Sequence, residues 1–325
     1  MTYGSVPYGD GAASSYPSGP CLTVRYLVDR TFDLLLQSAR EERNQLASAL
    51  DASSTTFTVT YDLANLARGT YIAIDDEVMY VWSTTKGSGG TSTITVQRAD
   101  KGTSPATHAA GSIIQVNPYF TRYSVKQTLK DEIRSWGPQI FQVLTADISA
   151  TNYVRGYDMG ALGQWFYVLN VTESPDPMTG ITSDNMWSSV PYRIERSANL
   201  AAFPSGNAIF FTSPQGVFSS PRTFHITYAA PFDVDTSFND TDCLHITGVD
   251  YSNIDIAPYG AAWRLASGRE IRRMLTEAQG QSADLTNFPA GYMVKAAEDF
   301  KNLRDSRLDD AEEQLRAMYP VRRTT

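Results

Sequence analysis

Residues 72–81 have the sequence IAIDDEVMYV, in which three acids stand between two apolar runs. A turn centred on Asp75 and Asp76 sets up a register that pairs Ile74 with Glu77, Ala73 with Val78, Ile72 with Met79 and Tyr71 with Tyr80. Aspartate tolerates the left-handed backbone of such a turn, and no His or Cys lies nearby in sequence to complete a metal site. We therefore predict a β-hairpin with its acids at a solvated tip and Glu77 near Arg98.

Period-two alternation of apolar residues extends on both sides of this hairpin, from Ser53 to Val116. The segments TTFTVTY, TYIAI, EVMYVW and STITVQR each fit a half-buried strand, and Gly87, Gly89 and Gly90 separate two of them. The sequence therefore predicts a small all-β module at residues 51–118, inserted into the rest of the chain.

Three other segments have apolar residues at the helical spacing of three and four. The first covers residues 22–48 and ends in the charged stretch AREERNQ. The second covers 121–136, with Thr121 as its expected N-cap, and the third covers 256–318 and contains two helices. Each has one apolar stripe that needs a partner, so we predict one helical core built from residues 22–50, 119–138 and 248–320.

Residues 139–247 return to short, evenly spaced strands with turns of Pro, Gly, Asp and Ser between them, which predicts an antiparallel β-sandwich domain. Its aromatic side chains are expected to fill the sandwich core, with a sugar-binding site as the alternative; they are Trp165, Phe166, Tyr167, Phe210, Phe211 and Phe224. The loop 232–242 resembles a calcium loop only faintly, because Phe238 and Leu244 replace the required Gly and Glu. The predicted fold class is α+β, a helical core built from N- and C-terminal helices and interrupted by the β-module and the sandwich.

Composition limits the function of the 325-residue chain. Hydrophobic residues make up 42% of it, which is enough for a sizeable core, and the formal net charge of −8 argues against a long groove for nucleic-acid phosphates. Cys21 and Cys243 form no ligand-spaced motif and are predicted to be two reduced thiols. We expect no signal peptide and no membrane span, because no apolar run is long enough.

The two ends of the chain are predicted to make contacts with partners. Residues 1–21 form an extended arm of Gly, Ser, Pro and Tyr, which has too few aliphatic side chains to order itself. Tyr3, Tyr8 and Tyr16 are its expected anchors on a neighbouring surface. Residues 321–325 form a basic tail, and Arg322 and Arg323 are expected to reach acids of a neighbouring subunit.

The chain contains none of the motifs that carry enzyme chemistry in sequence. It has no Gly-rich phosphate loop and no GxSxG. Its three histidines, His108, His225 and His245, are scattered along the sequence and form no ligand-spaced cluster. His108 is expected to hydrogen-bond within its loop, since no Ser or Cys nucleophile accompanies it. We therefore predict that the protein is not an enzyme and has no cofactor, although the paired carboxylates of a glycosidase would meet only in space.

The β-module resembles one found in virion proteins of tailed bacteriophages. The pattern is an acidic hairpin with Glu and Met, a strand that ends in Arg, then Gly-Thr, Ala, His and Gly. The matching residues here are Glu77, Met79, Arg98, Gly102, Thr103, Ala106, His108 and Gly111. A Gly commonly follows the Arg in that pattern and this chain has Ala99, so its turn geometry is expected to differ.

As a whole, the chain is similar to head-to-tail adaptor (neck) proteins of long-tailed phages. The resemblance implies a homo-oligomeric ring, commonly of twelve copies, around a channel that passes DNA without sequence recognition. Its expected neighbours are the portal protein and a tail-side neck or tail terminator protein, and its expected location is the virion neck after synthesis in the host cytoplasm. The alternatives are a tail or baseplate component and, from another class, a carbohydrate-binding or glycan-cleaving protein.

Overall fold

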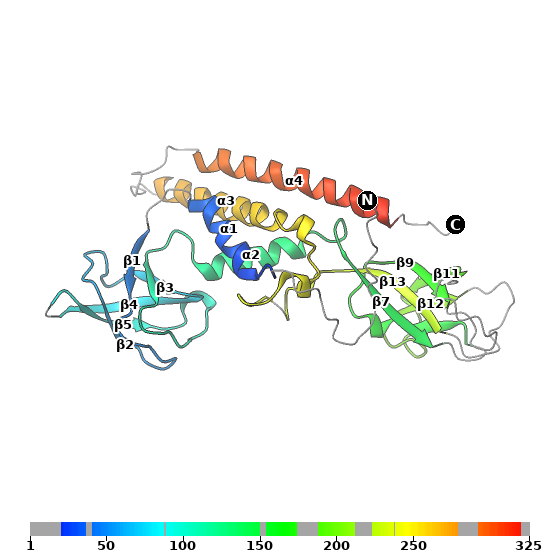
Figure 1. The fold of residues 1–325 in the computed structure, drawn as a ribbon, viewed down its shortest axis with the longest axis horizontal. Helices are drawn as coiled ribbons and strands as arrows, with labels where there is room; N and C mark the ends of the chain where they lie inside the picture. The colour runs from blue at the N-terminus through cyan, green and yellow to red at the C-terminus, as the bar shows by residue number, and fades with distance from the viewer. Residues whose placement is uncertain are drawn as a thin grey trace.

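The computed structural model describes residues 21–36, 41–87, 89–149, 154–173, 188–211, 223–236, 238–278 and 292–319. Within these ranges the architecture is mixed α+β, with four α-helices, a six-stranded antiparallel half-barrel and two small antiparallel sheets. Figure 1 shows the half-barrel and the small sheets at opposite ends of the molecule, with the helices between and above them. The predicted α+β class is therefore correct at this level.

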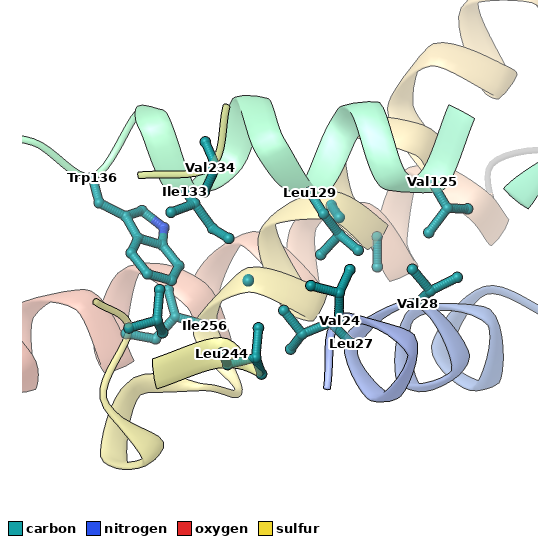
Figure 2. Packing of buried hydrophobic residues seen from close by; sticks show 14 of the residues in the cluster. Val24, Leu27, Val28, Val125, Leu129, Ile133, Trp136, Val234, Leu244 and Ile256 are labelled. Carbon is teal, nitrogen blue, oxygen red and sulfur yellow. The ribbon is translucent and has the colours of Figure 1, made fainter. Parts of the chain in front are cut away.

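The helices come from both ends of the chain and pack together. They are α1 (Val24–Leu36), α2 (Arg122–Arg134), α3 (Ile256–Ala278) and α4 (Tyr292–Met318). Helix α3 contacts the other three, and one hydrophobic cluster joins all four. In Figure 2, Val28 of α1 lies opposite Val125 of α2, and Trp136 lies at the other end of the cluster, near Ile256. The apolar stripes of these helices are thus buried against one another, as the sequence predicts.

The half-barrel contains the hairpin from which the sequence analysis began. Its strands are β1 (Glu42–Gln45), β2 (Thr56–Val59), β3 (Tyr71–Ile74), β4 (Glu77–Lys86), β5 (Ser92–Gln97) and β6 (Ile113–Val116), in the order β1-β6-β3-β4-β5-β2. Strands β3 and β4 pair in the predicted register, from Tyr71 with Tyr80 to Ile74 with Glu77. Asp75 takes up the left-handed conformation of the turn, with φ of 51°. The hairpin prediction is confirmed.

The predicted helix over residues 22–48 is wrong at its C-terminal end. Helix α1 ends at Leu36, and Glu42–Gln45 form β1, which pairs with β6. The buried Asn44 links β1 to the loop after β2, because its Nδ2 donates to the Tyr61 carbonyl at 2.7 Å and its Oδ1 accepts from the Tyr61 N–H at 3.1 Å. Leu46 and Leu50 belong to the half-barrel core, so the β-unit begins before residue 51.

The two small sheets share one hydrophobic cluster at the other end of the molecule. One sheet has the order β10-β9-β13-β7, from Ser188–Ser189, Tyr167–Glu173, Thr223–Ala230 and Gln142–Ser149. The other has the order β11-β12-β8, from Tyr192–Arg196, Asn207–Phe211 and Gly156–Asp158. Short 3₁₀ turns lie at η1 (Asp100–Gly102), η2 (Gly160–Leu162), η4 (Leu244–Thr247) and η5 (Tyr251–Asn253).

The prediction of two reduced thiols is also wrong, because Cys21 and Cys243 form a disulfide across 222 positions of sequence. Their segments run side by side, since the N–H of Val24 donates to Asp242 at 3.0 Å and the N–H of Leu244 donates to Leu22 at 2.9 Å. The disulfide attaches the start of α1 to the loop that leads toward α3.

Candidate functional site

Three of the residues that match the phage-type pattern, Arg98, Ala106 and His108, contact the carboxylate of Glu77. Arg98 binds it in a bidentate manner, with Nε 2.6 Å from Oε1 and the second terminal nitrogen 2.7 Å from Oε2. The backbone N–H groups of Ala99 and Ala106 donate to it at 3.2 and 3.0 Å. Nε2 of His108 lies 3.0 Å from Oε2. The hairpin, the end of β5 and the loop before β6 are thereby joined at one buried anion.

The expectation that all three acids sit at a solvated tip is wrong for Glu77, whose side chain has no exposed surface, whereas that of Asp75 is 72% exposed. The pairing with Arg98 was expected. Burial by itself raises the pKa of Glu77, but the hydrogen bonds from Arg98, His108 and Ala106 outweigh burial and hold the pKa below its ordinary value. Glu77 is therefore a charged, fully paired group inside the half-barrel.

Ala99 stands where a Gly commonly follows the Arg of the pattern. Ala99 has φ of 56° and ψ of 43°, so it takes up the left-handed conformation that glycine adopts without strain. Its N–H points to Glu77, and that hydrogen bond offsets part of the cost of placing an alanine there.

His108 is buried between two carboxylates, because its Nδ1 lies 3.1 Å from Asp75 and its Nε2 lies 3.0 Å from Glu77. Its backbone forms a two-way bridge with Leu50, with both N–H to O distances at 2.8 Å. Thr103, the one hydroxyl of the pattern, accepts from the Val78 N–H at 3.2 Å and donates to the Asp100 carbonyl at 2.9 Å. The expectation that the His108 ring hydrogen-bonds within its own loop is therefore wrong in its partners, because both ring nitrogens contact acids of the hairpin, 33 and 31 positions away.

A second charged cluster fixes the hairpin tip to the helices. Nζ of Lys126 on α2 lies 2.5 Å from Asp76 in the turn and 3.1 Å from Asp240 in the loop before Cys243. Arg122, also on α2, lies 2.8 Å from Asp240 and 3.3 Å from Asp29 on α1. Burial raises the pKa of Asp240, but Arg122 and Lys126 outweigh it and lower that pKa. This cluster joins α1, α2, the hairpin and the 238–243 loop.

A third cluster lies inside the helical bundle, around Glu132 of α2. Its side chain has no exposed surface and receives Nε of Arg264 from α3 at 2.8 Å and Nε of Arg304 from α4 at 2.7 Å. The indole N–H of Trp136 donates to it at 3.1 Å. Helix α3 carries Gly260 at this level, and a Cβ there would stand 2.2 Å from the Glu132 carboxyl carbon. One anion thus holds three helices together.

A cleft of about 660 Å³ lies where α2 ends against the small sheets. Trp165 and Phe166 line it with Arg134, Arg196 and Asn207. The guanidinium of Arg196 lies over the Trp165 ring at 4.7 Å and also donates to the Phe166 carbonyl at 2.6 Å. Of the aromatic residues named as a possible sugar platform, Phe211 and Phe224 are buried in the shared core.

The remaining residues singled out in the sequence belong to none of these clusters or lie outside the described part of the chain. Tyr3, Tyr8, Tyr16, Arg322 and Arg323, the predicted partner contacts, lie outside the described residues. In the loop proposed as a faint calcium site, Asp233 accepts from the N–H groups of Asp235 and Thr236 at 3.3 and 3.2 Å, as in an ordinary turn. His225 pairs with Asp147 on the neighbouring strand.

Within the described ranges, no group of three or more His, Cys, Asp or Glu side chains is arranged to hold a metal ion. No helix among the described residues has both the length and the apolar character that a membrane span needs. Comparison with known proteins gives no matching family model and no similar curated protein for this chain.

Proposed function

We propose that this protein is a structural component of a tailed-bacteriophage virion, a head-to-tail adaptor that forms a ring between the portal and the tail around the DNA channel. The observation that carries the proposal is the convergence of the phage-type pattern on one buried anion. Glu77 accepts from Arg98, Ala99 and Ala106 and contacts His108, so the pattern residues serve to hold a β-unit in shape. A motif whose residues hold a β-unit in shape favours a structural protein over an enzyme.

The three charged clusters support the same function, because they connect the parts of the subunit rigidly. Glu132 ties α2 to α3 and α4, and the Asp240 cluster ties the half-barrel to α1 and α2. A subunit that transmits load between a capsid and a tail needs such cross-links between its parts. The pairs of Glu77 and Glu132, whose side chains are fully buried, are costly to break once formed.

The exposed side of α4 suits a wall beside moving DNA. Its exposed charged residues are five acids, Glu298, Asp299, Asp309, Asp310 and Glu313, against three bases, Lys295, Lys301 and Arg316. A stripe of cations would bind phosphates and slow the passage of DNA, whereas an acidic excess does not. We place α4 on the channel side or at a subunit contact for this reason.

Binding to isolated neighbouring rings tests the neck position. Purified full-length chain should cosediment with portal rings of the cognate phage and leave free tail tubes unbound. Binding to tail tubes or baseplates alone would move the protein to the tail or baseplate, the first alternative.

The proposal includes the absence of catalysis. Incubation of the full chain with peptidoglycan and with host surface polysaccharide should release no new reducing ends. Turnover that a single Asp or Glu substitution abolishes would make the protein a glycan-cleaving enzyme.

The cleft at Trp165 makes carbohydrate binding the second candidate. Its aromatic lining favours a sugar, but Arg196 already covers the Trp165 ring at 4.7 Å, on a face that a sugar would need. Glycan-array binding by the full chain that is lost in Trp165→Ala would favour this candidate, and absence of binding would remove it.

A further inference from the structure

The outer surface of the half-barrel carries a row of aromatic rings with a cation at each end. Tyr71 of β3 and Tyr80 of β4 lie edge to face with centroids 5.5 Å apart, and Tyr80 and Trp82 follow at 5.3 Å. Lys101 lies 3.7 Å above the Tyr71 ring, and Arg68 lies 5.3 Å from the Trp82 ring. We name these five residues the aromatic ladder.

The ladder arises from the local structure of β4. Tyr71 and Tyr80 are cross-strand partners on the face opposite the half-barrel core. The pairing of β4 with β5 shifts between Val81 and Ser83, so Trp82 is the extra residue of a bulge. Trp82 lies two residues after Tyr80 and therefore on the same face of the strand, where it is 45% exposed.

The composition of the ladder is that of an interface centre. Trp, Tyr and Arg are the residues most enriched among those that contribute most to binding between proteins. The rings meet at 67° and 82°, so they do not form one flat platform for a stacked sugar or base. The two cations of the ladder favour an acidic partner. Asp100, the acid that directly precedes Lys101, accepts from the backbone N–H of Lys101.

The same chain carries a surface with the complementary character. On the exposed side of α4, Leu303 is 48% exposed and stands between Asp299, four residues before it, and Asp310, seven residues after it. Asp310 also lies 3.6 Å from Arg307 of the same helix, an ion pair that leaves its side chain 58% exposed. These spacings place the three side chains on one face of the helix, and Glu313 continues that face. We name these four residues the acidic face.

We infer that the aromatic ladder of one subunit binds the acidic face of α4 in the next copy of this chain. Leu303 enters between the rings, and Asp299 and Asp310 meet Arg68 and Lys101. Figure 1 shows α4 along one edge of the molecule, with the half-barrel beyond the other helices. The two surfaces are therefore different parts of the subunit, and a contact between unlike surfaces builds a ring when its rotation closes. This inference rests on the proposed ring and names the contact that builds it.

Charge exchange on the full-length chain tests the contact. One variant carries Arg68→Glu with Lys101→Glu, and the other carries Asp299→Lys with Asp310→Lys. Each alone should raise the concentration at half assembly by at least about 30-fold, the change expected when a residue central to binding is lost. An equimolar mixture of the two should assemble again in alternating rings, because each reversed surface then meets its complement. Mass photometry gives the assembled fraction, and far-UV circular dichroism confirms that both variants are folded.

A matched control reverses Arg43→Glu with Arg155→Glu, two exposed cations outside the ladder, and should assemble like the wild type. Assembly of both ladder and α4 variants at wild-type concentrations would overturn the inference while the proposed ring survives. Failure of the mixture to assemble would overturn the pairing of these two surfaces. A wild-type chain that stays monomeric would overturn the ring and the contact together. A ladder variant that assembles normally but loses binding to a host glycan would assign the ladder to that ligand instead.

Discussion

Replacement of Glu77 by Gln should destabilise the half-barrel far more than any change at its exposed neighbour. The Glu77 side chain is fully buried and that of Arg98 is only 6% exposed, so the loss of the carboxylate leaves a guanidinium buried without its counter-charge. Breaking a buried pair by removing one partner costs about 3–5 kcal/mol. Glutamine keeps the volume of glutamate, so the effect is electrostatic and leaves no cavity.

The assay is hydrogen exchange with mass spectrometry on the full-length chain, because one unfolding midpoint is ill defined for a chain of several units. Amides of β3 and β4 should exchange roughly 10²–10³-fold faster or more in Glu77→Gln, the equivalent of about 3–5 kcal/mol. Peptides from α3 and α4 should exchange as in the wild type, since local openings follow cooperative units.

Asp75→Asn is the matched control. It changes the same kind of group in the same hairpin, two residues away, but the Asp75 side chain is 72% exposed and contacts His108 at 3.1 Å. An exposed pair contributes about 0–1 kcal/mol, so exchange should rise by less than about fivefold. Equal exchange rates in the two variants would refute the view that Glu77 is the anion on which the half-barrel depends.

Three further predictions follow from other contacts. Gly260→Ala should destabilise the helical bundle by about 1–3 kcal/mol, because its Cβ would stand 2.2 Å from the Glu132 carboxyl carbon. Gly268→Ala, with open space around it in the same helix, should stabilise the bundle by up to about 1 kcal/mol, and hydrogen exchange of α3 peptides compares the two variants. The contribution of Glu77 to the stability of the half-barrel should be complete above about pH 4.5, its ordinary pKa. This contribution should fall as the pH drops toward the lower pKa of the folded state, because the unfolded state binds more protons over that range. Hydrogen exchange from pH 3 to 6 should show this dependence in the wild type and not in Glu77→Gln. Replacement of residues 41–118 by a short Gly-Ser linker should preserve the helical circular dichroism signal of the remaining chain. The two ends of the excised segment are adjacent, because Oε1 of Glu41 accepts from the Tyr119 N–H at 3.3 Å. Loss of all helical signal would contradict a separate helical core.

The hairpin could be predicted in detail because its information is local. Two turn residues and period-two alternation fix which residues of a short hairpin face one another, and the structure has that register. The contact of Glu77 with Arg98 was also within reach, since only the short excursion of β4 and β5 separates them. The alternation alone did not predict that Glu77 faces the core. A single acid on a core face is acceptable only with partners that neutralise it, and those partners could not be identified from the hairpin sequence.

The errors concern pairings over long sequence separations. The residues of β1 are polar, three of the four (Glu42, Arg43 and Gln45) form helices well, and only their partner β6, with Glu42 opposite Val116, makes them a strand. Cys21 and Cys243 are 222 positions apart, so no spacing rule connects them. Glu132 has the same limitation, because Arg264 and Arg304 reach it from 132 and 172 positions away. Its position on the apolar side of α2, beside Trp136, was the one local sign of a buried acid.

The mass of the particle that the purified wild-type chain forms tests the central claim most directly. The chain has a mass of 35.8 kDa, so a twelve-copy ring corresponds to about 430 kDa. Mass photometry over a range of concentrations should give one dominant closed species of that order, and electron micrographs of the same sample should show rings with an open centre. A single peak at the monomer mass at every concentration, or an open series of oligomers with no closed species, would contradict the account of this protein as a ring-forming adaptor.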